Sequence, residues 1–278
     1  MAIDLKGPLV LVGAGNMGGA MLTGWLAEGL DPKLVRVQDP SPPAAIAALL
    51  AQHGIEAEAE LELDRPPAVM LMAVKPQIMD QVFPSAAKLA GAGTVVLSVA
   101  AGKTIASFER HLPKGSAVVR TIPNTPASVG RGITGAYANP ATTSAQKALC
   151  QKLLEAIGQV VWVEREDLID AVTAVSGSGP AYVFHMVEAM TAAGIAAGLP
   201  ADTAAALARA TVSGAGEMLH RSTLDPATLR RNVTSPNGTT YAALEVLMGP
   251  MLDGEKKLER LMTDAIAAAT RRSRELAG

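Results

Sequence analysis

The stretch Leu9-Val-Leu-Val12, followed by Gly13-Ala-Gly-Asn-Met-Gly18, decides the fold expected of this chain. Four consecutive aliphatic residues predict a buried strand, and a helix is expected after the glycines. The glycines fit Gly-x-Gly-x-x-Gly, the spacing of the turn that joins the first strand and helix of a dinucleotide-binding fold. Gly13 makes the tight turn, Gly15 lets the backbone approach a pyrophosphate, and Gly18 lets the helix pack on the strand.

Outward from this turn, strand-like and helix-like segments alternate as far as residue 163, which is typical of an α/β fold. The expected strands cover residues 9–12, 34–38, 69–74, 94–99, 117–121, 133–137 and 159–163. After Glu164 the expected helices cover about 166–175, 180–198, 202–221, 239–248 and 254–276. We expect an N-terminal Rossmann-like domain over residues 1–163, with a mostly parallel, doubly wound sheet, and an all-α C-terminal domain over residues 164–278.

The composition excludes several classes of partner and site. A formal net charge of −2 over 278 residues, without a basic block, argues against nucleic acid and anionic membrane surfaces as partners. The single cysteine, Cys150, excludes an internal disulfide and a thiolate metal cluster. The four histidines form no metal-binding pair, so we expect no metal. No secretory signal precedes the first strand, which favours a cytoplasmic location.

One segment has the length of a membrane span but is not expected to cross a membrane. Residues 171–199 are almost free of charge, yet Gly177, Gly179 and Pro180 interrupt them and Glu188 lies among them. A helix buried in the core or between subunits is the better interpretation. The helical half has more apolar surface than about 115 residues hide easily, so we expect a homodimer, with a self-contained bundle as the alternative.

The ends of the expected strands supply the rest of a nucleotide site, because ligands of a doubly wound sheet bind beyond the carboxyl ends of its strands. The predicted cofactor-binding residues are Gly13, Ala14, Gly15, Asn16, Met17, Gly18, Asp39, Ser41, Ala73, Val74, Lys75, Pro76, Ala100, Ala101 and Gly102. Lys75 is either a contact to a cofactor hydroxyl or a solvated lysine. Asp39 favours NADH, since an acid there usually holds a ribose 2′-hydroxyl and no arginine follows to receive a 2′-phosphate.

A second candidate site is the run Asn232-Val-Thr-Ser-Pro-Asn-Gly-Thr-Thr240, which leads into an expected helix. The N–H groups at a helix start bind anions, and Ser235, Thr239 and Thr240 add hydroxyl donors. Helix capping is the alternative role for Ser235 and Thr240, although it does not explain three hydroxyls together. A dinucleotide site and an anion site in one chain indicate a small reductase.

Five motifs, in this order, resemble those of the pyrroline-5-carboxylate reductase family. They are Gly13-Ala-Gly-Asn-Met-Gly18, Ala73-Val-Lys-Pro76, Arg120-Thr-Ile-Pro-Asn-Thr-Pro126, Ser176-Gly-Ser-Gly-Pro-Ala-Tyr182 and Val233-Thr-Ser-Pro-Asn-Gly-Thr-Thr240. The last two motifs are the ones that are specific to this family. The resemblance implies hydride transfer from NAD(P)H to the cyclic imine 1-pyrroline-5-carboxylate, giving L-proline in the last step of proline biosynthesis. It puts NADPH ahead of NADH as the cofactor.

The resemblance also implies an assembly and a substrate site. Family members dimerise through the helical domain, and their dimers often form decamers. Their active site lies where one subunit's nucleotide domain meets its partner's helices. The substrate carboxylate is expected at Ser235, Gly238, Thr239 and Thr240, with the Thr240 hydroxyl facing the ring nitrogen as the catalytic group. Asn232 resembles a position that contacts both cofactor and substrate, and Glu166 resembles one associated with proline binding.

The chain departs from the family pattern at two places. The family often has Gly-Gly where this chain has Asn237-Gly238, a change that the turn tolerates because asparagine can adopt a positive φ. Residues 56–62 are acidic where relatives often place an asparagine that contacts adenosine. Together with Asp39, this segment leaves the preference between NADPH and NADH open.

Three other functions fit parts of the pattern. A β-hydroxyacid dehydrogenase shares the two-domain plan, but it has a catalytic lysine on the first long helix of its second domain, and residues 171–199 contain no lysine. A non-catalytic dinucleotide sensor would need no site for a small carboxylate. A reductase of another cyclic imine, such as a six-membered ring, stays open.

Overall fold

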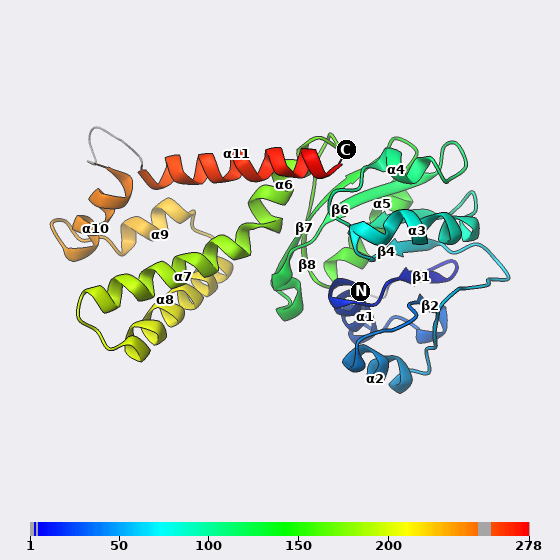
Figure 1. Cartoon of the computed structure of the whole chain (residues 1–278), viewed down its shortest axis with the longest axis horizontal. Coiled ribbons are helices and arrows are strands. Elements are labelled where there is room, and N and C mark those ends of the chain that lie inside the picture. Colours follow the sequence, from blue (N-terminus) through cyan, green and yellow to red (C-terminus); the bar gives the residue numbers. More distant parts are fainter. Residues whose placement is uncertain (1–2, 4, 250–256, 278) are drawn as a thin grey trace. The chain divides into compact units, whose positions relative to one another are not determined.

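The structure is a computed structural model that describes residues 3, 5–249 and 257–277. The chain divides into two compact units. The first unit comprises residues 1–178 and 269–278, and the second comprises residues 179–268. Figure 1 labels most of the helices and strands.

Within the described residues, an eight-stranded sheet forms the centre of the first unit, in the order β3-β2-β1-β4-β5-β6-β7-β8. The strands are β1 (Leu9–Val12), β2 (Val35–Gln38), β3 (Ala57–Glu58), β4 (Val69–Met72), β5 (Val95–Ser98), β6 (Ala117–Ile122), β7 (Gly132–Ala138) and β8 (Gly158–Trp162). The pairs from β3 across to β6 are parallel, β7 is antiparallel to β6, and β8 is parallel to β7. The mostly parallel, Rossmann-like sheet predicted from the sequence is confirmed.

Each face of this sheet has its own apolar core, because alternate strand residues point to opposite faces. Helices lie on both faces (Figure 1): α1 (Asn16–Ala27), α2 (Ala44–Gln52), α3 (Pro76–Ala86), α4 (Ile105–Glu109), α5 (Ser144–Glu155) and α6 (Leu168–Val172). Leu11 packs in one core with Trp25, whose indole N–H donates to the carbonyl oxygen of Leu153 at 2.8 Å. Val12 packs in the other core with Phe83. The doubly wound arrangement therefore follows from the alternation within each strand.

Helices account for the secondary structure that is described in the second unit. They are α7 (Gly179–Ala196), α8 (Ala201–Arg221), α9 (Pro226–Asn232), α10 (Thr239–Met248) and α11 (Lys257–Ala277), whose last residues belong to the first unit. A Cβ on Gly194 would lie 3.2 Å from the Cβ of Ala204, so α7 and α8 approach closely at that glycine. Several large apolar side chains stay exposed, among them Phe184 and Val246. In the described ranges, no helix combines the length and the apolar character needed to cross a membrane.

The structure adds elements that the sequence patterns did not predict. These are the short strand β3 and the helices α3, α4 and α9. Strand β6 continues through Ile122, one residue past the expected end at residue 121, because the first proline comes only at residue 123. Residues 254–256, the expected start of the last helix, lie outside the described residues. The domain boundary at residue 163 stays a prediction.

Gly135 gives a test of the packing between β7 and α6. A Cβ on Gly135 would overlap Cγ1 of Val172, so Gly135→Ala should lower the free energy of unfolding by about 1–3 kcal/mol through overpacking. The midpoint of urea denaturation, followed by tryptophan fluorescence, measures this change. Gly93→Ala is the matched control, because a Cβ there would meet no atom within 4 Å. Equal midpoints for the two variants would contradict this packing.

Candidate functional site

The parallel strands of the first unit end in register at one edge of the sheet. Val12 lies opposite both Gln38 and Met72, and Met72 lies opposite Ser98. The segments that follow these four residues are therefore neighbours beyond the carboxyl ends of β1, β2, β4 and β5. They contain all the cofactor-binding residues predicted between Gly13 and Gly102.

The glycine turn after β1 has the geometry that its spacing predicts. Gly13 has φ 89°, and a Cβ there would approach the backbone nitrogen of Val74 to 2.9 Å. A Cβ on Gly18 would overlap the carbonyl oxygen of Gly13, so only glycine lets α1 begin this close to the turn. By contrast, a Cβ on Gly15 would meet no atom within 4 Å. The helix α1 starts after Gly15 without a side-chain cap, which leaves its first N–H groups available to an anion.

Asp39 holds the glycine turn against the end of β2. One oxygen of its carboxylate accepts a hydrogen bond from the N–H of Ala14 at 2.7 Å, and the other accepts one from the N–H of Ser41 at 2.9 Å. Bonds from N–H groups to a charged acceptor are stronger than neutral ones, so Asp39 fixes the position of this turn. Ala14 was predicted to bind the cofactor, and its N–H group already has a hydrogen-bond partner within the chain.

A cavity of about 610 Å³ lies beyond the ends of β4 and β5, within the first unit. Its lining residues are Pro76, Gln77, Ala101, Gly102, Lys103, Thr173, Ser178, Ala269, Arg272, Ser273 and Leu276. Pro76, Ala101 and Gly102 were predicted to bind the cofactor. Nζ of Lys103 donates to both carboxylate oxygens of Asp80 at 2.8 Å, which holds the pKa of that carboxyl below its usual value. The volume is that of a pocket for a small organic ring.

Sequence reasoning missed the last turns of α11, which line this cavity. Their only sequence signal is an amphipathic pattern, and that pattern does not identify the surface that they contact. In the structure the Ser273 hydroxyl donates to Oδ1 of Asp170 on α6 at 2.7 Å, and both side chains are buried. A Cβ on Gly102 would lie 3.3 Å from the carbonyl oxygen of Leu276. These contacts hold the C-terminal end of α11 at the cavity.

Glu166, predicted to bind substrate, makes its contacts within the first unit. Its Oε1 lies 3.0 Å from Nη1 of Arg120 and accepts the N–H of Ile105 at 2.8 Å. The guanidinium of Arg120 is 3% exposed, and its Nη2 lies 3.9 Å from Oδ1 of Asp170. Breaking a buried ion pair leaves a charge uncompensated, so the contact between Arg120 and Glu166 is an anchor of this region. A substrate role for Glu166 stays a prediction.

The remaining substrate-binding residues predicted from the sequence lie in the second unit, at the end of α9 and the start of α10. Asn237 has φ 56°, so the asparagine adopts the left-handed conformation expected of it. The N–H of Gly238 donates to the carbonyl oxygen of Ser235 at 3.1 Å. A Cβ on Gly238 would approach Oγ of Ser235 to 2.5 Å, so a glycine is needed beside that hydroxyl. Asn232 is the last residue of α9.

Helix capping does not explain the hydroxyl groups at the start of α10. The N-cap residue is Gly238, and no side chain caps the helix. Among the described residues, the hydroxyls of Ser235, Thr239 and Thr240 have no hydrogen-bond partner. Uncapped N–H groups and nearby hydroxyl donors together suit a small carboxylate.

Two family models match separate parts of the chain. Residues 166–276 match the model described as pyrroline-5-carboxylate reductase dimerisation. Residues 8–102 match the model described as NADP oxidoreductase, coenzyme F420-dependent. The second match covers the strand ends at which the predicted nucleotide-binding residues gather.

Individual proteins match over almost the whole chain. The pyrroline-5-carboxylate reductase of Pseudomonas aeruginosa is 41% identical over 97% of this chain and 96% of its own length. That of Pasteurella multocida is 35% identical over 96% of this chain and 97% of its own length. The structure of the Coxiella burnetii reductase covers 98% of this chain and 99% of its own, with a TM-score of 0.87 and 34% identity. The Plasmodium falciparum pyrroline carboxylate reductase, solved with NADP bound, has a TM-score of 0.78 and 26% identity, and covers 98% of this chain and 99% of its own.

The open space beside Gly15 gives a test of the nucleotide site. Gly15→Val should leave the fold intact, because a Cβ there meets no atom within 4 Å, but its side chain should fill the space that a pyrophosphate needs. The Kd for NADPH, measured by calorimetric titration, should rise by about 10-fold or more, which corresponds to ~1.4 kcal/mol. Gly93→Val, also in open space, is the control. Normal affinity in folded Gly15→Val would place the nucleotide elsewhere.

Proposed function

This chain belongs to the pyrroline-5-carboxylate reductase family, and we propose that it reduces the cyclic imine 1-pyrroline-5-carboxylate to L-proline with NADPH as the hydride donor. It is an NAD(P)H-dependent oxidoreductase that acts on a C=N bond. The observation that carries the proposal is the presence of two complementary sites in one chain. The strand ends of the first unit suit a dinucleotide, and the uncapped start of α10 in the second unit suits a small carboxylate.

The residues at the strand ends fit NADPH. We assign the pyrophosphate to the N-terminus of α1 beside Gly15, where the added Cβ finds open space. The adenosine ribose is assigned to Asp39 and Ser41, with the Ser41 hydroxyl as a donor to the 2′-phosphate. The nicotinamide is assigned to the cavity that Pro76 and Gly102 line. When bound, the nicotinamide supplies the hydride. NADH stays an alternative donor, because the Asp39 carboxylate also suits a ribose 2′-hydroxyl.

The residues around α10 bind and orient the imine in this proposal. The substrate carboxylate accepts hydrogen bonds from the hydroxyl of Ser235 and from the backbone N–H groups of Gly238, Thr239 and Thr240. The Thr240 hydroxyl faces the ring nitrogen. A protonated imine is already electrophilic, so the protein contributes mainly position and hydrogen bonds rather than a strong base. Asn232 is proposed as a contact to both ligands.

Turnover sets a requirement on the assembly. The reacting carbons of nicotinamide and imine must come within about 3–3.5 Å, so a nucleotide site and a carboxylate site must face each other during the reaction. The family resemblance implies that these sites come from two subunits. We therefore propose a homodimer as the working assembly, and a decamer of such dimers. We also propose a cytoplasmic location, which accords with a single unpaired cysteine, Cys150.

Oxidation of NADPH at 340 nm, with 1-pyrroline-5-carboxylate as substrate, tests the reaction. One L-proline should form for each NADPH consumed. A six-membered cyclic imine should give a kcat/KM at least about 10-fold lower, because an extra methylene group costs roughly 1–3 kcal/mol in a fitted pocket. Greater activity on the six-membered imine would identify a different reductase. Nucleotide binding without turnover of either imine would favour the sensor.

The Thr240 hydroxyl has a separate test. Thr240→Ala should lower kcat/KM by roughly 10–100-fold, since it removes one hydrogen bond to the reacting group, and Thr240→Ser should recover most of the loss. The Kd of Thr240→Ala for NADPH should stay within about twofold of the value for the unaltered protein, a difference of ~0.4 kcal/mol. Thr263→Ala is the control, because the hydroxyl of this helical threonine donates to the carbonyl oxygen of Glu259 at 2.7 Å. Unchanged kcat/KM in Thr240→Ala would remove Thr240 from the mechanism.

A further inference from the structure

The last turns of α11 present one face to the cavity that is assigned to the nicotinamide. Four residues of this helix line the cavity: Ala269, Arg272, Ser273 and Leu276. Their spacing is i, i+3, i+4 and i+7, which puts them on one face of a helix. They belong to the first unit, as do the other lining residues, which come from the segments after β4, β5 and α6. The cavity therefore has one wall that is remote in sequence from the strand ends.

Two contacts hold this face of α11 at the cavity. The Ser273 hydroxyl donates to Oδ1 of Asp170 on α6 at 2.7 Å, and the two residues are 6% and 7% exposed. On the other side, a Cβ on Gly102 would lie 3.3 Å from the carbonyl oxygen of Leu276, and the φ of Gly102 is 70°. A glycine suits both the close approach and the positive φ. The contact at Gly102 is close packing, whereas the bond from Ser273 is directional.

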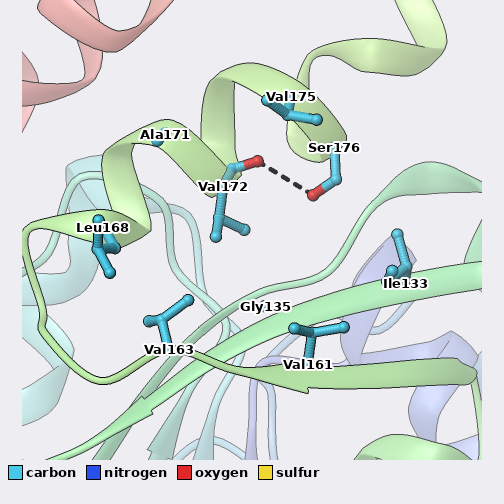
Figure 2. A pocket seen from close by; sticks show the side chains of 9 residues that line it. All are labelled: Ile133, Gly135, Val161, Val163, Leu168, Ala171, Val172, Val175 and Ser176. Carbon is cyan, nitrogen blue, oxygen red and sulfur yellow. Dashed lines mark hydrogen bonds between the residues drawn. The ribbon is translucent and has the colours of Figure 1, made fainter.

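The hydroxyl groups of the turn after α6 donate within their own helical segment. The Thr173 hydroxyl donates to the carbonyl oxygen of Ile169 at 2.8 Å. The Ser176 hydroxyl donates to the carbonyl oxygen of Val172 at 3.0 Å, a bond that Figure 2 shows. The hydroxyl of Ser273 differs, because it donates to another helix. We therefore expect Ser273 to act on a bound ligand through the position of α11.

Asp170 lies between Ser273 and a buried guanidinium. Its Oδ1 is 3.9 Å from Nη2 of Arg120, a distance longer than a hydrogen bond. Among the described residues, Nε and Nη2 of Arg120 are buried and have no hydrogen-bond partner. Buried donors without a partner are costly, so the guanidinium would attract the Asp170 carboxylate if Ser273 released it. Loss of the Ser273 hydroxyl should thus free the end of α11 while Asp170 keeps a partner.

We propose that Ser273 is a positioning residue for the nicotinamide, because its bond to Asp170 holds the last turns of α11 as a wall of the nicotinamide site. The proposal rests on the proposed function, since it takes this cavity as the nicotinamide site. Hydride transfer needs an aligned nicotinamide, so a displaced wall costs alignment. The adenosine end is assigned to Asp39 and Ser41, beyond β2, and β1 separates β2 from β4. The effect of Ser273 should therefore be confined to the nicotinamide end.

Two ligands that differ only at the nicotinamide test this role. 2′-Phospho-ADP-ribose has the adenosine, the pyrophosphate and both riboses of NADPH, but it has no nicotinamide. In Ser273→Ala, the Kd for NADPH from calorimetric titration should rise about 10-fold, whereas the Kd for 2′-phospho-ADP-ribose should stay within about twofold. Ser273→Thr keeps a hydroxyl and should recover most of the affinity for NADPH. Thr263→Ala is the control, because it removes a hydroxyl from the same helix, away from the cavity, and it should change neither Kd.

Hydrogen exchange tests the position of the helix end without a ligand. In Ser273→Ala, the amides of residues 269–277 should exchange at least about 10-fold faster than in the unaltered protein, because this end of α11 is no longer held. The amides of β1 and β4 should keep their exchange rates, which shows that the sheet stays folded. The proposal is overturned if Ser273→Ala binds NADPH normally, if it loses affinity equally for both ligands, or if the exchange of residues 269–277 is unchanged. These measurements need no turnover, so failure here and failure of the proposed reaction can be told apart.

Discussion

The common end point of the parallel strands β1, β2, β4 and β5 is the constraint on which the site depends. Strands β1, β4 and β5 are buried on both faces of the sheet, so the segments beyond the strand ends are the parts that offer backbone N–H groups and polar side chains to a ligand. The turn at Gly13 and Gly18 has no room for a Cβ at either position, whereas the space beside Gly15 is open. Asp39 then ties this turn to β2 through the N–H of Ala14. The nucleotide site follows from strand register and these close contacts.

A second feature is the return of the C-terminal end of α11 to the first unit. The bond between Ser273 and Asp170 holds this end against α6, and the ion pair between Arg120 and Glu166 joins β6 to the segment before α6. As a result, the cavity assigned to the nicotinamide is lined both by strand ends and by residues from the last turns of the chain. The turn that follows α6, Thr173–Gly177, supplies Thr173 to this cavity.

The sequence was sufficient where one short pattern determines one local structure. The glycine spacing predicted the turn at Gly13, and the tolerance of asparagine for a positive φ predicted the conformation of Asn237. Alternating strand and helix segments predicted the sheet. The sequence was insufficient where a contact joins distant segments. No periodicity indicates that Ser273 contacts Asp170 or that Glu166 pairs with Arg120. The helix α3 was not predicted from the sequence, because a proline directly after an apolar run indicates the end of a strand. In the structure, Pro76 lies in the first turn of α3.

The central claim is direct hydride transfer from NADPH to the imine carbon of 1-pyrroline-5-carboxylate. The most direct measurement uses NADPH with deuterium at both hydrogens of nicotinamide carbon 4, followed by mass spectrometry and NMR of the proline formed. The account predicts L-proline that carries one deuterium, on the ring carbon that belonged to the C=N bond. Proline without deuterium, or a failure to form proline in a protein that binds NADPH, would contradict the account.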